Sequence, residues 1–456
     1  MIEIITFLNY CILIFFIFSA IIYTTILVGS LSGIVEFFQR TKETNIYSLL
    51  PEKLPPVTII TAIYNEEKFV IQNILSSLNS DYKNLYILLV NDGSTDKTLE
   101  ILIKQFEMIE QPYHFQPKIP SSKPRALYIS KIHPHLMLID KPNSGVGDSL
   151  NVALNICFTP YFVTIDADSI IHEKAVSEML YEILAYPYAV AVGGGVYILN
   201  ACAVKNGQVV DSRMPHKLVP ALQSLEYMRS HLFNRTGWNH FGATMSYSGT
   251  ATLLKLEEVL NIKGYDRHNF AQDTEIILRL HYHLHREKKT YAILFNPSAT
   301  VWTDVPATLR EFGIQRDRWQ RGILRSVIRY WRMFLNPRFG IQGLFSYPTY
   351  VLLEAVAPLV ECLAYVTVTA AYLLGILNTT SAILYILLAW GFTSYLTFSN
   401  MLMNIITFNR YRKINDIVWM VFLVFIEMFG FRQYHTLVKV WGTFHYYFNR
   451  LRGKSL

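Results

Sequence analysis

The chain has apolar stretches near both ends and a more polar middle region. Residues 4–28 carry no charge and apolar runs return beyond residue 341, whereas residues 57–335 hold most of the acids and polar loops. A helix of about 20 apolar residues crosses the ~30 Å hydrocarbon core of a bilayer. The pattern therefore predicts a membrane part at each end and a folded polar part between them.

The first apolar stretch predicts a membrane anchor. A cleaved signal peptide is the competing interpretation, but Glu3 precedes the stretch without any Lys or Arg, and the apolar run is longer than a typical signal core. Arg40 and Lys42 follow it, so the positive-inside rule predicts an outer N-terminus and a cytoplasmic polar region. We expect residues 1–56 to form the anchor and a linker marked by Pro51, Pro55 and Pro56.

Residues 341–456 are expected to form a second membrane region. The stretches 344–377 and 382–408 are each long enough to span, and the basic loop 409–413 should be cytoplasmic. The stretch 417–431 is short for a crossing, and both a third span and a re-entrant segment fit it. A basic tail at Arg450, Arg452 and Lys454 closes the region.

The middle region alternates between strand and helix patterns. The expected strands are 57–63, 86–90 and 161–165, and the expected helices are 66–78, 96–106, 151–156 and 173–186. Such alternation is typical of βαβ units and predicts an α/β, Rossmann-like, mostly parallel sheet. In sheets of this kind ligands bind beyond the carboxyl ends of the strands.

Composition and charge narrow the function classes. Hydrophobic residues make up 52% and charged residues 16% of the chain, against about 25% charged in ordinary soluble domains. The net charge is +7, but the excess lies beside apolar stretches, where it fits anionic headgroups better than nucleic acid. The four cysteines are scattered without a CxxC pair, which argues against a disulfide framework or a zinc site.

The first candidate for ligand binding is Asp92, in Val90-Asn-Asp-Gly-Ser-Thr-Asp96 after an apolar strand. An acceptor at that sheet edge can meet the base or ribose of a nucleotide. The alternative is an Asx turn that leads into the next helix. For Asp96 we favour the turn, and for Asp92 both interpretations stay open.

The second candidate is the pair Asp166 and Asp168, in Val163-Thr-Ile-Asp-Ala-Asp168. Side chains alternate along a strand, so the two carboxylates point to the same side. Mg²⁺ is typically held by one or two carboxylates together with substrate phosphates. A divalent metal that bridges to a diphosphate is the favoured interpretation, and a helix cap at Asp168 is the alternative.

The third candidate is Asp273, in Ala271-Gln-Asp-Thr-Glu275. As a functional residue it would be the general base that deprotonates an acceptor hydroxyl. As a structural residue it would cap the helix that the periodic run from Ile276 predicts. The two roles are compatible, because a capping aspartate is normally ionised, and on this segment alone the cap is the favoured interpretation.

The fourth candidate is the set Gln315, Arg318 and Trp319, which share one face of a predicted helix at positions i, i+3 and i+4. The face offers an amide, a guanidinium suited to phosphate and an indole that can stack on a sugar. Neighbouring apolar and basic stripes predict that residues 307–340 form an amphipathic helix at the inner leaflet.

With these motifs in this order, the chain resembles the membrane-integrated branch of family 2 inverting glycosyltransferases, which includes cellulose, chitin, hyaluronan and poly-N-acetylglucosamine synthases. The resemblance covers the anchor, residues 57–330 and the C-terminal spans. It implies a GT-A fold for residues 57–306, a UDP-sugar donor, Mg²⁺ or Mn²⁺, and β-linked products. It also implies that Asp273 is the catalytic base and that Asp166 and Asp168 hold the metal.

The resemblance further implies two binding sets. The implied donor-binding residues are Tyr64, Glu66, Asp92, Lys141, Asp166, Gln315 and Arg318, and the implied acceptor-binding residues are Trp319, Ser248 and Gly249. Two positions depart from the family pattern: Gln272 replaces the acid that usually precedes the base, and Val146 replaces a lysine of the donor-binding segment.

The sequence thus predicts a multi-pass cell-membrane enzyme with a cytoplasmic catalytic domain. It is expected to polymerise a β-linked polysaccharide from a UDP-sugar, processively and with inversion, and to extrude the product. Its expected partners are the donor, a growing glycan or lipid acceptor, membrane lipids and accessory membrane or export proteins, with no nucleic acid. The alternatives are single-sugar transfer to a membrane lipid and a non-catalytic scaffold or transporter subunit.

Overall fold

The computed structural model describes residues 2–43, 54–408, 410, 411 and 413–453. The chain forms two compact units. The helical unit comprises Met1–Ile34, Met214–Ala243 and Pro306–Leu456, and the sheet unit comprises Val35–Arg213 and Thr244–Val305. Position 51 of the expected linker and positions 409 and 454 of the expected basic segments lie outside the described residues.

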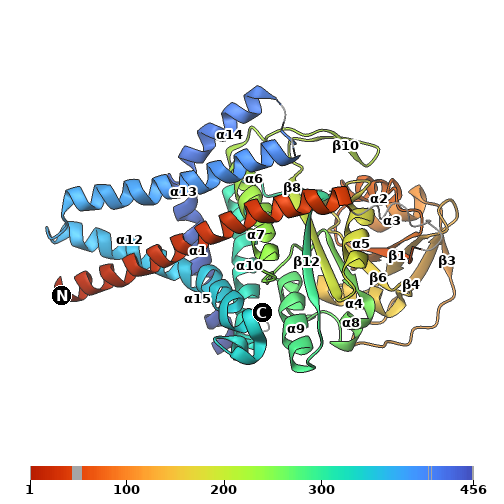
Figure 1. The fold of residues 1–456 in the computed structure, drawn as a ribbon. Helices are drawn as coiled ribbons and strands as arrows, with labels where there is room; N and C mark the ends of the chain where they lie inside the picture. Colours follow the sequence, from red (N-terminus) through yellow and green to blue (C-terminus); the bar gives the residue numbers. More distant parts are fainter. Residues whose placement is uncertain (1, 44–53, 409, 412, 454–456) are drawn as a thin grey trace. The chain divides into compact units, whose positions relative to one another are not determined.

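The sheet unit contains a ten-stranded sheet in the order β3-β4-β5-β2-β1-β6-β11-β8-β12-β7 (Figure 1). The strands are β1 (Val57–Ile63), β2 (Leu85–Asn91), β3 (Met108–Gln111), β4 (Ala126–Ser130), β5 (Leu136–Asp140), β6 (Tyr161–Thr164), β7 (Ser169–Ile171), β8 (Ala189–Ile198), β11 (Thr252–Lys255) and β12 (Ala292–Thr303). Strands β5, β2, β1 and β6 are parallel, as are β8 and β12. The remaining pairings are antiparallel, so the sheet is mixed around a parallel core, where the sequence indicated a mostly parallel one.

Helices pack on this sheet where the sequence alternation predicts them. Helix α4 packs on β1 and β2, and α5 packs on β8 and β12. The helices of the unit are α2 (Val70–Leu78), α3 (Thr98–Gln105), α4 (Val146–Ile156), α5 (Ala175–Ala185), α8 (Leu256–Asn261) and α9 (Gln272–Arg286). A separate hairpin of β9 (Ala203–Lys205) and β10 (Gln208–Asp211) lies outside the main sheet.

The helical unit contains three helices that are long and apolar enough to cross a membrane, counted over the described part of the chain: Ile2–Gln39, Gln342–Leu373 and Ala382–Phe408. A fourth candidate consists of Ile414–Ile426 and Phe431–Leu451, which are bent by 60° at a short break. The bend fits a broken span or a re-entrant loop, the two alternatives that the sequence left open for this region.

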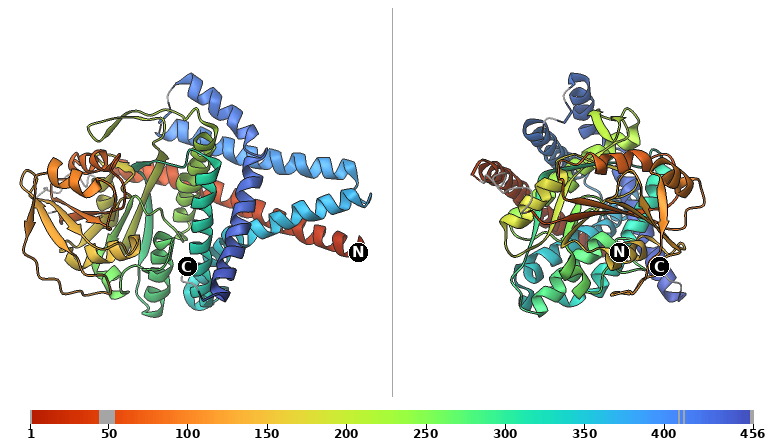
Figure 2. Two further views of the ribbon diagram at one scale, coloured as in Figure 1. Left: turned by 180° about the vertical axis from the view of Figure 1, so that it is seen from behind. Right: turned by 90° about the vertical axis from the view of Figure 1, so that its right-hand side faces the viewer.

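The elements of the helical unit are α1 (Ile2–Glu43), α6 (Leu218–Tyr227), the π-helix η3 (Met228–Phe233), α7 (Asn234–His240), α10 (Leu309–Arg329), η4 (Trp331–Met333), η5 (Pro337–Phe339), η6 (Gln342–Ser346), α11 (Tyr347–Tyr350), η7 (Val351–Val356), α12 (Ala357–Leu373), α13 (Thr379–Phe408), α14 (Ile414–Ile426) and α15 (Phe431–Leu451). The part of α1 up to Ile34 belongs to this unit. Helices α10 and α15 pack side by side (Figure 2).

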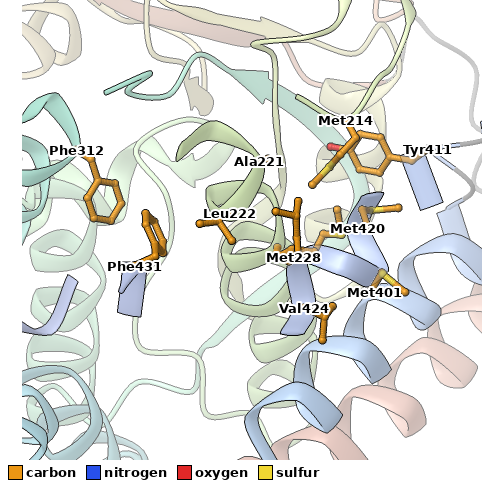
Figure 3. Packing of buried hydrophobic residues seen from close by; sticks show 12 residues of the cluster. Met214, Ala221, Leu222, Met228, Phe312, Met401, Tyr411, Met420, Val424 and Phe431 are labelled. Carbon is orange, nitrogen blue, oxygen red and sulfur yellow. The ribbon is translucent and has the colours of Figure 1, made fainter. Parts of the chain in front are cut away.

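The core of the helical unit lies around α6. Figure 3 shows buried side chains from α6, α10, α13, α14 and the start of α15 in one cluster. Its members are Met214, Ala221, Leu222, Leu225, Met228, Phe312, Met401, Tyr411, Met420, Leu423, Val424 and Phe431. The segment Met214–Ala243 therefore supplies the centre of a core whose other members come from residues 312–431. The sequence analysis, which expected the sheet domain to end at residue 306, assigned this segment to the sheet domain. The domain boundaries themselves stay a prediction.

Glycines let α1 approach α7 closely. A β-carbon at Gly29 would lie 2.5 Å from the Phe241 ring, and one at Gly33 would lie 3.1 Å from Thr236 Cγ2. On the other side, a β-carbon at Gly237 would lie 2.4 Å from the carbonyl oxygen of Ile26. Small residues four apart are the usual means of close helix packing in membranes, so glycine is required at this contact.

Ion pairs join α15 to the helices before it. Arg432 donates to Glu361 at 3.0 Å, and Lys439 donates to Glu354 at 3.1 Å. The two cations are seven residues apart on α15, and the two carboxylates are seven residues apart on η7 and α12, in the opposite order. The contacts therefore form an antiparallel ladder of charges between neighbouring helices.

Candidate active site

The sheet unit places Asp166 and Asp168 in the turn that follows β6. Asp168 accepts hydrogen bonds from Ser169 Oγ at 3.2 Å and from Thr303 Oγ1 at 3.3 Å. The next element is strand β7 rather than a helix, which removes the alternative that Asp168 caps a helix. Both carboxylates are only half-buried, so the turn presents them beyond the carboxyl end of a central strand.

Asp166 and Asp273 line the same pocket, although 106 positions separate them in the sequence. Asp273 lies in the first turn of α9, one residue past its start, and its Oδ1 accepts from the amide of Thr274 at 2.7 Å. It is therefore not the N-cap, which is Ala271. The other lining residues are Ala62, Val146, Leu150, Thr164, Ile165, Ser248, Gly249, Thr252, Tyr265, Gln272 and Ile276.

The pocket leaves room for a ligand beside Asp166. Gly249 has no side chain, and a β-carbon there would lie 3.5 Å from Asp166 Oδ1. Gln272 is buried, and its Oε1 atom finds no hydrogen-bond partner among the described residues. An unpartnered acceptor in a pocket is costly unless a ligand satisfies it.

Mutual repulsion of acids dominates the electrostatics of the site. Burial, followed by the charges of Asp168, Asp273 and Glu66, raises the pKa of the Asp166 carboxyl to about 8. Burial also raises the pKa of Asp168, and burial with the charge of Asp168 raises the pKa of Glu66 to about 7. A cation at this edge of the sheet would relieve the repulsion.

The donor set of the site fits a hard divalent cation. Its ligands are carboxylate oxygens, which Mg²⁺ and Mn²⁺ prefer. Within the described ranges no group of three or more His, Cys, Asp or Glu side chains forms a complete metal site. The site therefore suits a metal that takes two ligands from Asp166 and Asp168 and the others from substrate oxygens.

Asp92 is buried in a second cluster at the end of β2. Its carboxylate accepts from the amides of Ser144 and Gly145, both at 2.9 Å, and from the ammonium of Lys141. These bonds hold the loop that leads into α4, and α4 in turn supplies Val146 to the pocket.

Lys141, for which donor contact was expected, lies in the same cluster as Asp92. Its ammonium is completely buried, and it donates to Ser144 Oγ at 2.7 Å and approaches Asp148 at 3.4 Å as well as binding Asp92. A role of Lys141 in donor binding stays a prediction. Asp148 was not predicted as the second carboxylate, because the helix that contains it begins at Val146 and was expected to begin at residue 151.

Tyr64 and Glu66 lie in the turn after β1. The Tyr64 side chain is exposed, and the amide of Glu66 donates to Thr98 Oγ1 at 2.9 Å. Asp96 forms the turn that was favoured for it, since it accepts from the amide of Thr98 at 3.0 Å. Thr98 thus contacts both the turn after β1 and the turn at Asp96. The exposed Tyr64 side chain can contact a ligand.

Gln315, Arg318 and Trp319 belong to α10 of the helical unit, so the three residues lie on a helix as predicted. This helix ends at Arg329, whereas it was expected to extend over residues 307–340. The helix begins with a capping box in which Thr308 and Glu311 exchange hydrogen bonds. Arg318 is exposed, Trp319 is half-buried, and the Gln315 Oε1 atom is buried without a partner among the described residues. The pocket belongs to the sheet unit, and this helix face belongs to the helical unit. The roles of these three residues stay predictions.

Tyr265 is a pocket residue that sequence reasoning missed. It is buried beside Thr164 and Asp273, and the charge of Asp273 adds to the effect of burial in raising the pKa of its phenol well above the usual range. It lies in the irregular segment between α8 and α9, where no hydrophobic periodicity marks a position as buried. Only the fold brings it to the pocket.

Comparison with known proteins identifies the family. Residues 161–431 match the model of "Glycosyl transferase family group 2", and residues 58–118 match that of "Glycosyl transferase family 2". The poly-beta-1,6-N-acetyl-D-glucosamine synthase of Staphylococcus epidermidis is 24% identical over 87% of this chain and 85% of its own length. The enzyme of the same name from Staphylococcus aureus (strain COL) is 23% identical over 61% of this chain and 57% of its own.

A solved structure supports the fold independently. A mannosyltransferase from Pyrobaculum calidifontis, in complex with GDP-Man and Mn²⁺, superposes with a TM-score of 0.54 at 16% identity, over 85% of this chain and 97% of that one. The expected GT-A class is therefore confirmed. With the family match covering more than half of its length, the chain belongs to glycosyltransferase family group 2, as a membrane glycosyltransferase with a GT-A-like sheet unit.

Proposed function

We propose that the protein is a metal-dependent, inverting synthase that polymerises a β-linked polysaccharide from a UDP-sugar and moves it across the membrane. The observation that carries the proposal is the shared pocket of Asp166 and Asp273, which brings a metal-ligand candidate and a base candidate to one place. The Staphylococcus epidermidis synthase supports a polymer product, because its similarity extends over 87% of the chain, apolar helices included. UDP-N-acetylglucosamine is accordingly the first donor to test.

In this proposal each part of the sheet-unit site has a chemical task. Asp166 and Asp168 would hold Mg²⁺ or Mn²⁺, which would supply neutralisation of charge on the donor diphosphate and on the departing UDP. Tyr64 and the loop fixed by Asp92 bind the uridine, with Glu66 nearby. Ser248 and Gly249 border the space for the acceptor sugar.

Asp273 is the proposed general base. It removes the proton from the acceptor hydroxyl as that oxygen attacks the anomeric carbon, and the bond to UDP breaks on the opposite face, which inverts the configuration. The position of Asp273 in the first turn of α9, on the pocket that Asp166 also lines, supports this role. On α10, Gln315 and Arg318 are proposed to bind the diphosphate and Trp319 to stack on the acceptor sugar.

The proposed topology has residues 1–56 as anchor and linker, a cytoplasmic catalytic domain over 57–306, an interfacial helix region over 307–340 and further spans over 341–456. Within the residues that the structure describes, three helices long and apolar enough to cross a membrane support the multi-pass arrangement. The glycan would leave through the membrane region, with any accessory export protein bound there.

The test uses the purified full-length protein in lipid nanodiscs with radiolabelled UDP-N-acetylglucosamine, UDP-glucose or UDP-glucuronate, with Mg²⁺, Mn²⁺ or EDTA. We expect metal-dependent UDP release and long products from one donor. A single-sugar glycolipid would contradict polymerisation and favour the lipid-transfer alternative. Absence of UDP release with every donor and metal would contradict the enzymatic proposal as a whole.

A further inference from the structure

Within the five-residue stretch from Gln315 to Trp319, one side chain faces inward. Arg316 is only 3% exposed, and its guanidinium forms two parallel contacts with Glu226 of α6: Nη1 to Oε1 at 2.9 Å and Nη2 to Oε2 at 3.1 Å. Such a two-pronged contact fixes the plane of the guanidinium as well as its position. Glu226 therefore determines how the Arg316 side chain is oriented.

The fixed guanidinium covers the ring of Trp319. Its central carbon lies 4.2 Å from the centre of the Trp319 ring and 4.7 Å from that of Phe312. Phe312 is fully buried in the helical-unit core, with its ring centre 5.0 Å from that of Phe431. The guanidinium is thus held between a rigid core ring and an indole that is half-exposed.

We propose that Arg316 and Glu226 are positioning residues that hold Trp319 as the platform for the acceptor sugar. This inference rests on the proposed function, in which Trp319 stacks on the acceptor. Cation–π attraction binds the guanidinium to one face of the indole. An acceptor sugar is consequently restricted to the opposite face or the edge of the ring, which sets the side from which the acceptor approaches.

A second contact of α10 provides a matched control. Asp317, the next residue, accepts from Arg321 at 3.0 Å and contacts His445 of α15 at 3.1 Å. This contact also joins α10 to a neighbouring helix, α15, but the Trp319 ring does not take part in it. If Arg316 served only to anchor the helix, loss of the His445 contact would have the same kinetic signature.

The variants are chosen so that folding is preserved. Removing one partner of a buried ion pair leaves an uncompensated charge, whereas replacing both with neutral groups of similar volume is often tolerated. We therefore use Arg316→Lys, which keeps the charge but loses the planar fork, and the double variant Glu226→Gln/Arg316→Met. His445→Gln is the control, and the thermal midpoint of each protein is measured in nanodiscs.

The experiment measures KM for a short β-1,6-linked N-acetylglucosamine oligosaccharide, KM for UDP-N-acetylglucosamine, kcat, and oligosaccharide Kd by calorimetry. We expect Arg316→Lys and the double variant to raise the acceptor KM and Kd about tenfold with little change in donor KM, while His445→Gln leaves the acceptor KM unchanged. Unchanged acceptor KM and Kd in both Arg316 variants would overturn the inference, as would the same rise in His445→Gln.

The calorimetric Kd separates this inference from the proposed function. If the wild-type protein binds the oligosaccharide but shows no turnover, the proposed function fails, and the effect of the Arg316 variants on Kd still decides the role of the pair. If the wild-type protein does not bind the oligosaccharide, the acceptor platform is absent and the inference is overturned.

Discussion

Arg229 and Glu427 form a two-pronged ion pair within the helical unit, in which Glu427 is buried and Arg229 is partly buried. The Nη1 and Nη2 atoms of Arg229 donate to the two carboxylate oxygens at 3.0 and 2.7 Å, and Nη1 also donates to Thr397 at 2.5 Å. Arg229 lies on the π-helix η3, Thr397 on α13, and Glu427 at the break between α14 and α15. The pair therefore joins three parts of the chain at the point where α14 bends into α15.

Breaking this pair from one side should destabilise the protein. Glu427→Gln leaves the partly buried Arg229 cation without its counter-charge, and we expect a loss of about 2–3 kcal/mol in the free energy of unfolding, below the range for a fully buried pair. The double variant Arg229→Met/Glu427→Leu removes both charges and should recover most of the loss. Thermal unfolding in detergent measures the stability of the single and the double variant. Equal destabilisation by the two would contradict the ion-pair explanation.

The proposed base is tested by Asp273→Asn. The amide cannot accept the proton, so we expect kcat to fall about 10²–10⁴-fold while UDP binding, measured by calorimetry, stays within twofold. Asp211→Asn, on the separate β9–β10 hairpin, is the matched control and should retain full activity. Turnover of Asp273→Asn at the wild-type rate would show that another group takes the proton.

The raised pKa values of Asp166 and Glu66 predict competition between protons and metal. A carboxyl whose pKa is higher in the folded protein than in the unfolded chain binds protons preferentially in the folded state. The metal-free protein should therefore lose stability as the pH rises from about 4 through about 8, the range between the ordinary and the raised pKa of Asp166.

A divalent metal should reverse this loss, because it binds the ionised carboxylates. We expect Mn²⁺ to raise the thermal midpoint more at pH 8.5 than at pH 6, by about 2–4 °C for each kcal/mol of additional binding free energy. Asp166→Asn should abolish the pH dependence of the metal effect. A metal-induced shift that is the same at both pH values would argue against Asp166 and Glu66 as part of the metal environment.

The space beside Asp166 can be filled with a single methyl group. A β-carbon at Gly249 meets Asp166 and Gln272 only at ordinary contact distances of 3.5–3.7 Å, so Gly249→Ala should fold normally. The methyl group would nevertheless take space from a bound ligand, and we expect kcat/KM to fall about tenfold, equivalent to about 1.4 kcal/mol. Gly391→Ala in α13, where a β-carbon meets nothing within 4 Å, is the control.

The contact between α1 and α7 can be tested through Gly29. Its β-carbon would overlap the Phe241 ring, so Gly29→Leu should force the helices apart at a cost of about 1–3 kcal/mol. Gly391→Leu places the same side chain where the structure has room. A comparison of thermal midpoints in detergent decides the matter, and equal values for the two variants would exclude tight packing at Gly29.

Strand β1 shows what hydrophobic pattern alone predicts well. Its expected and observed bounds are both Val57–Ile63, because a β-rich, almost completely buried run that follows Pro55 and Pro56 has few alternatives. Helix α2 was expected to begin at Glu66 but begins at Val70. The intervening turn, with Asn65 at φ 56°, is held by Ser94 and Thr98, which follow the next strand, and no local pattern reports such contacts.

The candidate active site was likewise predictable from the sequence only in part. The motif residues Asp166 and Asp273 could be named from the sequence, because acids after a strand or at a helix start suggest specific chemistry. That they share a pocket depends on the position of β11 beside β6, which no local pattern reveals. The environment of Lys141 was missed for a related reason: whether a lysine is exposed or fully buried depends on partners such as Asp148, which the fold supplies.

The two anchoring contacts of α10 have a mechanical consequence. Arg316 ties the helix to α6 and Asp317 ties it to α15, on consecutive residues. Sliding α10 along its axis by one turn, about 5.4 Å, would break both contacts at once. The two contacts therefore resist a shift of α10 along its axis, and in the proposed elongation the glycan would have to move across a helix that stays in place.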